Sequence, residues 1–230
     1  MKLLVLIGAS GGPLYGGFVE NWKKVQLPPN VKLYFTYSTE DGQTTTEIRN
    51  GNEIYFPFKR PADGVDIVET MSHAMRMQHY RWALENEEFD VVLAGTCSSA
   101  FRFKKMLEWL STKPMTNHCF GRRLWNDFPS GCGYILTRDV VERIVKWTPP
   151  RVWHDDLTNR DFINATGVSV IEWELDHEAH HPQDRLWVFI DPYTTSHFHL
   201  RFKTSFKVEE RGKDVVNHLN VITYWNEQDM

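Results

Sequence analysis

The chain has 230 residues and a formal net charge of −4, with 41% of its residues hydrophobic and 24% charged. This composition is typical of a globular protein and excludes a disordered chain. The acidic balance argues against general nucleic-acid binding, which needs a basic surface. The three cysteines form no CxxC pair, which argues against a disulfide framework or structural zinc and favours a reducing compartment.

The N-terminal sequence MKLLVLIG resembles the start of a signal peptide, but its apolar run is too short for one. No apolar stretch approaches the roughly 20 residues that cross a bilayer. We therefore expect a cytoplasmic protein without a membrane span.

In chain order, the first predicted element is a buried strand at residues 3–7, an apolar run that ends at a glycine. A short helix is expected at 18–25, and alternating residues predict a second strand at 31–37. A further short strand is expected at 53–57. Apolar residues at helical spacing then predict a long helix at 66–86.

The second half of the chain continues this alternation. Apolar runs predict strands at 89–93 and 132–136. Helices are expected at 103–110 and at 138–147, the latter with Thr137 as its N-cap. The last expected elements are a helix at 154–166, a strand at 168–173 and a final helix at 213–219.

Strands that alternate with helices predict an α/β fold, with a mostly parallel central sheet and helices on both faces. Ligands of such sheets bind beyond the carboxyl ends of the strands. We therefore expect the loops after Ile7, after Leu93 and before Cys132 to converge. The absence of an internal repeat or long linker in the sequence favours one domain.

The loop after the first strand is glycine-rich. Gly8, Ala9 and Ser10 precede two further glycines, but the spacing is not that of the G-x-G-x-x-G dinucleotide fingerprint. The loop is either a nucleotide contact or a simple tight turn.

The segment 94–100 is small and rich in hydroxyl groups, and it follows a predicted buried strand. Thr96 and Ser98 could approach a ligand closely and offer several hydrogen-bonding groups. Local turns that cap the next helix explain the same residues equally well.

Two carboxylates stand side by side at Asp155 and Asp156. One of them could act as a general base, or both could face a cation. A solvated helix start is the alternative. A zinc site at His177, His180 and His181 is not favoured, because no cysteine or carboxylate stands at a suitable spacing.

The segment 197–203 alternates polar and apolar residues near the end of the chain. An extended strand would project His197, His199, Arg201 and Lys203 from one face. Such a face meets either solvent or an anion such as a diphosphate.

Four segments stand in an order that resembles a known family. Residues 88–99 resemble the stretch fDfiiRTNlSSF, and residues 129–141 resemble SGtGiiLSrDvv. Residues 154–157 stand where that family has DDVaIG, and residues 198–203 resemble yhyRvKs. On these segments the chain resembles fringe-like or galactosyltransferase-like glycosyltransferases of the GT-A fold, common in viruses, phages and bacteria.

The resemblance implies a single Rossmann-like GT-A domain. Residues 1–110 would form its nucleotide-binding half, and residues 111–230 its acceptor-binding and catalytic half. It also implies transfer of a hexosyl or pentosyl group from a nucleotide-diphosphate sugar to an acceptor hydroxyl, with inversion at the sugar. A viral or phage member would act in the host cytoplasm.

The resemblance also implies roles for individual residues. Asp156 would be the general base, with Asp155 orienting it. Arg201 and Lys203 would neutralise the leaving diphosphate. The expected donor-binding residues are Gly8, Ala9, Ser10, Arg76, Thr96, Ser98, Arg201 and Lys203, and the expected acceptor-binding or sugar-binding residues are Ser130, Gly131 and Trp153.

The sequence departs from the family pattern at three places. Ala94, Gly95 and Thr96 stand where the family has Arg-Thr-Asn, and Asn159 stands near the position of its Gly after the acidic motif. There is also no Asp-x-Asp. Whether a divalent cation, Mn or Mg, takes part is therefore open, with His199 as a possible ligand.

The expected acceptor is a glycan or a glycoprotein. Basic-aromatic clusters at 101–105 and 121–123 raise an alternative, a hydroxylated modified base in phage DNA, which would have to be flipped out of the stack. A non-catalytic protein that binds sugar nucleotides is a further alternative. A nucleotide-dependent oxidoreductase would need the dinucleotide fingerprint that this sequence lacks.

Overall fold

The computed structural model describes residues 1–10, 12–39, 44–57, 67–124, 128–149, 155–173, 176–178, 198–203 and 208–229. The chain divides into two compact units, each assembled from three stretches. Unit 1 comprises Met1–Gly8, Lys32–Gly95 and Pro114–Trp173, and unit 2 comprises Ala9–Val31, Thr96–Lys113 and Glu174–Met230. Both units take segments from either side of residue 110, and the expected division there stays a prediction.

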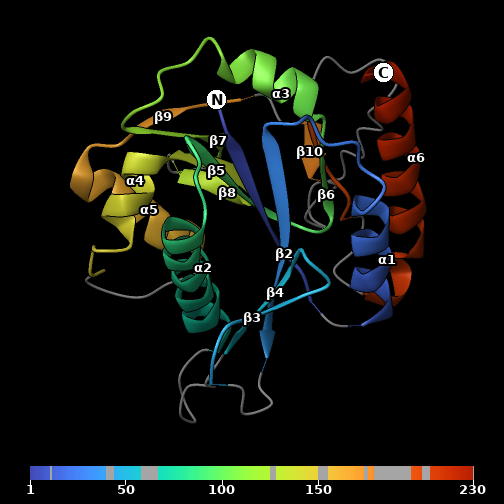
Figure 1. The fold of residues 1–230 in the computed structure, drawn as a ribbon, viewed down its shortest axis with the longest axis horizontal. Coiled ribbons are helices and arrows are strands. Elements are labelled where there is room, and N and C mark those ends of the chain that lie inside the picture. The colour runs from blue at the N-terminus through green and yellow to red at the C-terminus, as the bar shows by residue number, and fades with distance from the viewer. Residues whose placement is uncertain are drawn as a thin grey trace. The chain divides into compact units, whose positions relative to one another are not determined.

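Unit 1 is organised around an eight-stranded sheet (Figure 1), in the order β3-β4-β2-β1-β5-β8-β7-β9. Its strands are β1 (Leu3–Gly8), β2 (Val31–Thr39), β3 (Glu47–Arg49), β4 (Glu53–Pro57), β5 (Val91–Thr96), β7 (His118–Leu124), β8 (Phe128–Thr137) and β9 (Ser169–Ile171).

The strands of this sheet are mostly parallel. β2 pairs in parallel with β4, and β7 with β9. β1 and β5 also run parallel, because the Lys2 carbonyl accepts the amide of Asp90 at their start and Gly8 lies beside Gly95 at their end. Only β3 and β8 run antiparallel to the neighbours with which they pair. The expected α/β fold class is confirmed.

The central strands are buried on both faces, as the continuous apolar run predicts. Successive side chains of a strand point to opposite faces, and no side chain of residues 3–7 is more than 2% exposed. One face packs against α2 (Ile67–Asn86), α4 (Arg138–Ile144) and α5 (Asp155–Thr166). Within this core the hydroxyl of Tyr80 donates to that of Tyr134 over 2.8 Å.

Thr137 stands at the N-cap position of α4, as expected. Thr137 makes no side-chain cap bond to the helix. Its hydroxyl instead accepts the His118 amide and donates to the His118 carbonyl, both over 3.2 Å. Thr137 is the last residue of β8, so the neighbouring strand β7 is in reach and competes successfully for the hydroxyl.

Unit 2 contains a three-stranded sheet in the order β10-β11-β6. β11 pairs in parallel with β10 and antiparallel with β6. The elements of this unit are α1 (Pro13–Trp22), β6 (Ser99–Phe101), α3 (Phe103–Leu110), β10 (Asp176–Glu178), β11 (His199–Arg201), the 3-10 helix η1 (Val208–Glu210) and α6 (Gly212–Asp229).

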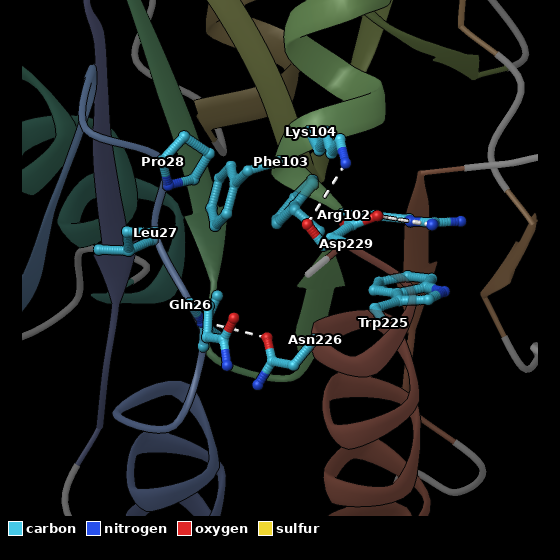
Figure 2. A pocket seen from close by; sticks show the side chains of 11 residues that line it. Gln26, Leu27, Pro28, Arg102, Phe103, Lys104, Trp225, Asn226 and Asp229 are labelled. Carbon is cyan, nitrogen blue, oxygen red and sulfur yellow. Dashed lines mark hydrogen bonds and ion pairs between the residues drawn. The ribbon is translucent and has the colours of Figure 1, made fainter.

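Helices α1 and α6 pack side by side in unit 2 (Figure 1). A Cβ atom on Gly17 would lie 2.9 Å from Cγ1 of Val215, so this close approach requires glycine. The Asn21 side chain donates to the Val215 carbonyl over 2.7 Å. At its far end α6 is tied to α3 by the ion pair of Arg102 and Asp229 (Figure 2).

Helix α6 extends well beyond the expected range 213–219. Its second half buries Val221, Ile222 and Trp225 in a small core with Ala100 and Leu200. The polar residues between these positions mask the apolar stripe in the sequence. Of the helices in the described part of the chain, none is both long enough and apolar enough to span a bilayer.

Candidate functional site

The topology of the large sheet marks one edge of unit 1 for ligand binding. From β1 the chain proceeds to β2 and β4 on one side, and then to β5 on the other side. Ligands of open α/β sheets bind beyond the carboxyl ends of the strands at this reversal. Gly8 ends β1 and Gly95 is the next-to-last residue of β5, and a Cβ on Gly8 would lie 3.5 Å from the Gly95 carbonyl oxygen. Two residues without side chains therefore lie next to each other near the ends of these strands.

The segment before Cys132 reaches the same edge. Gly133 of β8 pairs with Gly95 of β5, and the two strands are antiparallel. Ser130 and Gly131 precede Gly133, so they lie beyond the carboxyl end of β5. The ends of β1 and β5 and the segment before Cys132 thus lie together in unit 1, whereas the loop residues Ala9, Ser10, Thr96 and Ser98 belong to unit 2.

Ser130 itself is occupied by a local contact. It is 2% exposed, its hydroxyl lies 3.0 Å from Sγ of Cys132, and it accepts the Cys132 amide over 3.4 Å. Ser130 therefore shapes this part of β8, whereas the half-buried Gly131 leaves backbone open at the edge.

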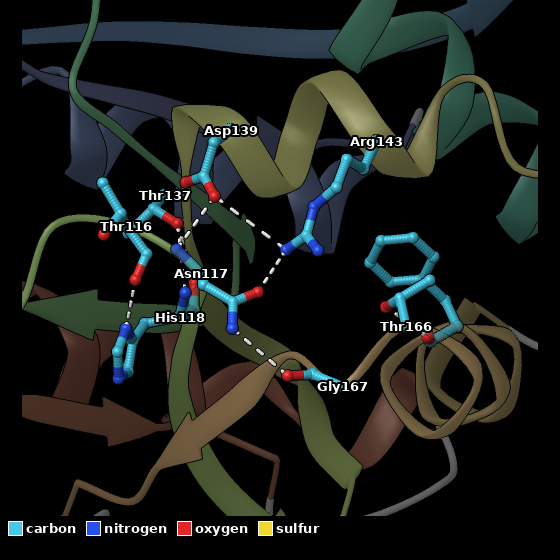
Figure 3. Close-up of polar contacts among 9 residues, drawn as sticks. Thr116, Asn117, His118, Thr137, Asp139, Arg143, Thr166 and Gly167 are labelled. Atoms are coloured by element: carbon cyan, nitrogen blue, oxygen red, sulfur yellow. Dashed lines mark hydrogen bonds and ion pairs between the residues drawn. The ribbon is translucent and has the colours of Figure 1, made fainter.

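A polar network fixes the far end of α5 (Figure 3). The Asn117 side chain donates to the Gly167 carbonyl over 3.2 Å and accepts a hydrogen bond from Arg143. The Asn117 amide donates to Asp139 over 2.9 Å. Because Asn117 directly precedes β7, whose start pairs with the end of β8, the carboxyl end of α5 lies at that end of β8.

The direction of α5 follows from this anchor. The helix packs against β8 and has 12 residues, so it is about 18 Å long. Its first turn, which begins with Asp155 and Asp156, is therefore directed toward the edge that carries Gly131. The side chains of the two aspartates and all of Trp153 lie outside the described residues.

Arg76 is buried over β8. It is 7% exposed, and its guanidinium carbon lies 6.0 Å from the centroid of the Tyr134 ring. Burial, and after it the Arg76 charge, lowers the pKa of His79 well below its usual range. His79 is therefore neutral, with its ring 4.7 Å from that of Phe56.

Sequence reasoning missed Ser38. This residue lies near the carboxyl end of β2, and its hydroxyl is buried with no hydrogen-bond partner among the described residues. Thr36, two residues earlier, donates to the Ile7 carbonyl over 3.3 Å, which aligns this end of β2 with the end of β1. A buried hydroxyl without a protein partner points to a ligand or water. The run of hydroxyl residues at the strand end was the available signal.

Unit 2 brings the hydroxyl-rich segment and the cationic tail together. Arg201 pairs with Ser99 across β11 and β6, and the Phe202 amide donates to the Ser98 carbonyl over 2.8 Å. Ser98 and Arg201 are thus neighbours although they are far apart in the sequence. Of the glycine loop, Ala9 is buried and Ser10 is exposed.

Arg201 is a cation without a counter-ion in the described part of the chain. Its Nε is buried and has no hydrogen-bond partner there, and the same holds for the hydroxyl of Thr96. Burial raises the pKa of the Cys97 thiol to about 11, against the opposing charges of Arg201 and Arg211. A buried guanidinium nitrogen without an acceptor is costly, and an anion would satisfy it.

A second arginine near this segment, Arg211, already has hydrogen-bond partners within the protein. Arg211 donates to Asp214 over 2.9 Å and to the Phe202 carbonyl over 2.7 Å, and Asp214 is fully buried. Arg211 is therefore structural, which leaves Arg201, with the half-buried Lys203, as the candidate anion contact of unit 2.

His199 does not join the exposed face expected for this tail. Its ring is fully buried and stacks on Phe101 with 4.1 Å between centroids. His197 lies outside the described residues. Within the described ranges no group of three His, Cys, Asp or Glu side chains is arranged to hold a metal ion. A Mn or Mg ion, with His199 as a ligand, stays a prediction.

Comparison with solved structures gives a likeness of fold. No protein-family model matches the chain, and no curated protein matches it. The chain is similar to a solved structure described as "Crystal structure of a glycosyltransferase involved in the glycosylation of the major capsid of PBCV-1", with 10% identity, a TM-score of 0.45, and coverage of 94% of this chain and 100% of that chain. A likeness of this size does not establish an activity.

Proposed function

We propose that this protein is a glycosyltransferase that moves a sugar from a nucleotide-diphosphate donor to an acceptor hydroxyl. The observation that carries the proposal is the reversal of strand order in unit 1, where two residues without side chains, Gly8 and Gly95, lie side by side near the ends of β1 and β5. Nucleotide ligands of α/β sheets bind at such a point. The segments around Gly95 and Gly131 are also among those that resemble nucleotide-sugar transferases.

The buried Nε of Arg201, which has no hydrogen-bond partner among the described residues, supports an anionic donor. A diphosphate offers several acceptor oxygens, and hydrogen bonds between charged groups are the strong ones. Negative charge grows on the diphosphate as it leaves, so a fixed cation stabilises the transition state more than the ground state. In this proposal Arg201 and Lys203 contact the diphosphate, while Thr96 and Ser98 donate to its oxygens or to the ribose.

Asp156 is the proposed general base. It takes the proton of the acceptor hydroxyl as that oxygen bonds to the anomeric carbon, and the bond from this carbon to the diphosphate oxygen breaks. Attack opposite the leaving group inverts the sugar. Asp155 would orient Asp156. The first turn of α5, directed toward the open edge of unit 1, supports this assignment.

The Asp156→Asn variant tests the base. A general base contributes roughly 100-fold or more to the rate, so we expect turnover to fall by at least that factor with donor affinity nearly unchanged. Asp161→Asn, on the same helix, is the matched control and should keep wild-type turnover. Turnover near the wild-type rate in Asp156→Asn would refute the assignment.

A thermal-shift screen against UDP-, GDP-, TDP- and CMP-sugars tests the donor. A ligand at 100 times its dissociation constant stabilises the fold by about 2.7 kcal/mol. Arg201→Gln should weaken the binding of the selected donor roughly tenfold or more. Arg81→Gln, an exposed arginine of unit 1, should not. No shift with any of these donors would contradict the proposal, and donor binding without release of nucleoside diphosphate would indicate a binding protein.

One observation favours a glycan over DNA as the acceptor. Within the cluster 101–105, Phe101 and Phe103 are each 3% exposed, and Arg102 is paired with Asp229. The cluster therefore offers no aromatic face on which a base could stack. Salt-sensitive binding of duplex DNA would reverse this preference.

A further inference from the structure

A cavity of about 270 Å³ lies in unit 2, beside the cluster 101–105 (Figure 2). Its walls come from the loop after α1, the first turn of α3 and the last turns of α6, and we call it the α3–α6 pocket. Its size is just below the roughly 300 Å³ at which pockets for drug-sized ligands begin. It suits one small ring better than a nucleotide.

The ion pair of Arg102 and Asp229 lines this pocket, and not all of its polar atoms are hydrogen-bonded within the described residues. Nε and Nη2 of Arg102 donate to the same oxygen of Asp229, Oδ1, over 2.9 and 2.6 Å. The two side chains are 15% and 20% exposed, so water screens them only in part. Nη1 of Arg102 and Oδ2 of Asp229 bond to no described residue. The ion pair therefore leaves one donor nitrogen and one acceptor oxygen without a partner among the described residues.

The apolar side chains that line the pocket expose more aliphatic than aromatic surface, and Gln26, Lys104 and Asn226 add polar groups. Leu27 is 38% exposed and Pro28 is half-buried, and both lie at the pocket (Figure 2). The rings of Phe103 and Trp225 also line it, but they are only 3% and 4% exposed. A flat base would find little ring surface to stack on, whereas the C–H face of a saturated ring can pack against the two aliphatic side chains.

We propose that the α3–α6 pocket binds one neutral hexose residue of a glycan through two neighbouring hydroxyls. One hydroxyl donates to Oδ2 of Asp229, and the next accepts from Nη1 of Arg102. Hydrogen bonds to charged groups are stronger than neutral ones, and the shared ion pair holds both partners in place. The site is separate from donor binding and from transfer, so it goes beyond the proposed function.

A pocket-filling variant tests the site without touching the ion pair. The probes are methyl glycosides of glucose, galactose and mannose, measured by saturation-transfer NMR with no nucleotide present. We expect transfer to at least one of them in the wild type, and a loss of at least roughly tenfold in affinity in Leu27→Trp. Ile48→Trp adds the same ring at an exposed position of unit 1 and should bind as the wild type does.

A charge variant tests the ion pair. Asp229→Asn keeps the shape but removes the charge, and it should weaken binding by about tenfold. Glu227→Gln removes a charge from an exposed position of the same helix and should have no effect. A thermal melt confirms that each variant is folded.

Three results would overturn the inference. They are no saturation transfer to any glycoside, wild-type binding in Leu27→Trp, and stronger binding of uridine or a DNA oligonucleotide than of a glycoside at this pocket. Asp156→Asn should bind the glycosides like the wild type, so a failure of the transfer proposal and a failure of this one are distinguishable.

Discussion

In unit 1 the ion pairs of Lys2 with Glu88 and of Arg49 with Glu47 lie at the surface, with side chains 43–86% exposed. In unit 2, Arg211 and Asp214 pair at 5% and 0% exposure. A surface pair exchanges water for a partner and contributes little. A buried pair must be fully hydrogen-bonded, because removing one partner leaves an uncompensated charge. The stability of unit 2 therefore depends on a buried ion pair, whereas these two exposed pairs contribute little to the stability of unit 1.

The largest effect is expected from Asp214→Ala. It leaves Arg211 buried without its carboxylate, and we expect the free energy of unfolding to fall by about 3–5 kcal/mol. Urea denaturation measures the loss. Glu47→Ala in unit 1 is the matched control and should cost less than about 1 kcal/mol. Equal losses of unfolding free energy in the two variants would contradict the expected difference between buried and exposed ion pairs.

The double variant Arg211→Met with Asp214→Leu sharpens the same comparison. Replacing both charges by apolar side chains of similar size removes the desolvation cost, so much of the loss should be recovered. A double variant no more stable than Asp214→Ala would show that the hydrogen bond from Arg211 to the Phe202 carbonyl matters more than the ion pair.

The next effect concerns pH. His218 donates from Nε2 to the Ser99 carbonyl, because a carbonyl can only accept. Burial lowers the pKa of His218 to about 4 from 6.5. Between these values the unfolded chain binds a proton that the folded chain does not. The contribution of His218 to the free energy of unfolding is therefore fully present above pH 6.5. It is lost as the pH falls toward 4, by at most about 3 kcal/mol.

His218→Gln keeps a donor for the Ser99 carbonyl but does not titrate. Urea denaturation at pH 7 and pH 4.5 should show a smaller loss in this variant than in the wild type. Part of the dependence should remain, because the pKa of His79 in unit 1 is lowered for the same reason. An unchanged difference between the two pH values would contradict the assignment to His218.

A smaller effect is expected at Asn117 of unit 1, whose backbone is left-handed with φ of 58°. Asn117→Ala loses the side-chain bonds to Gly167 and Arg143 and adds backbone strain, which should cost about 2–3 kcal/mol. Asn117→Gly loses the same bonds without the strain, so it should be about 1 kcal/mol more stable than the alanine variant. Identical unfolding midpoints would show that the strain is absent.

The smallest effect is expected for Lys2→Met. The pair of Lys2 with Glu88 is strongly exposed, so the unfolding midpoint should match that of the wild type. A clearly lower unfolding midpoint would show that exposed ion pairs of unit 1 do contribute to stability.

Local elements of this protein are readable from the sequence. The helix at 103–110 and the strand at 53–57 have the expected bounds, because their apolar spacing is set within a few residues. Strand β7 (His118–Leu124) was not expected, since its sequence HCFGRRL has no clear period. It forms because β8 and β9 flank it and supply the hydrogen bonds.

The candidate site was readable only in part. The glycine at the end of β1 and the hydroxyl-rich segment at Thr96 are visible as loops after apolar runs. Ser38 was not, because nothing in the sequence shows that its hydroxyl is buried with no partner in the described part of the chain. The α3–α6 pocket was not visible either, since Arg102 and Asp229 are 127 residues apart.

The sequence by itself determined the alternation of strands and helices, the burial of the central strands and the residue types at the strand ends. These features depend on the spacing of apolar residues and on turn residues, both of which are set by a few neighbouring positions in the sequence. Only the tertiary structure decided the reversed direction of β8 and the pairing of Arg211 with Asp214. It also decided that Nε of Arg201 is buried without a partner among the described residues. Such features depend on which segments meet across the fold, and on whether each buried polar group finds a partner there.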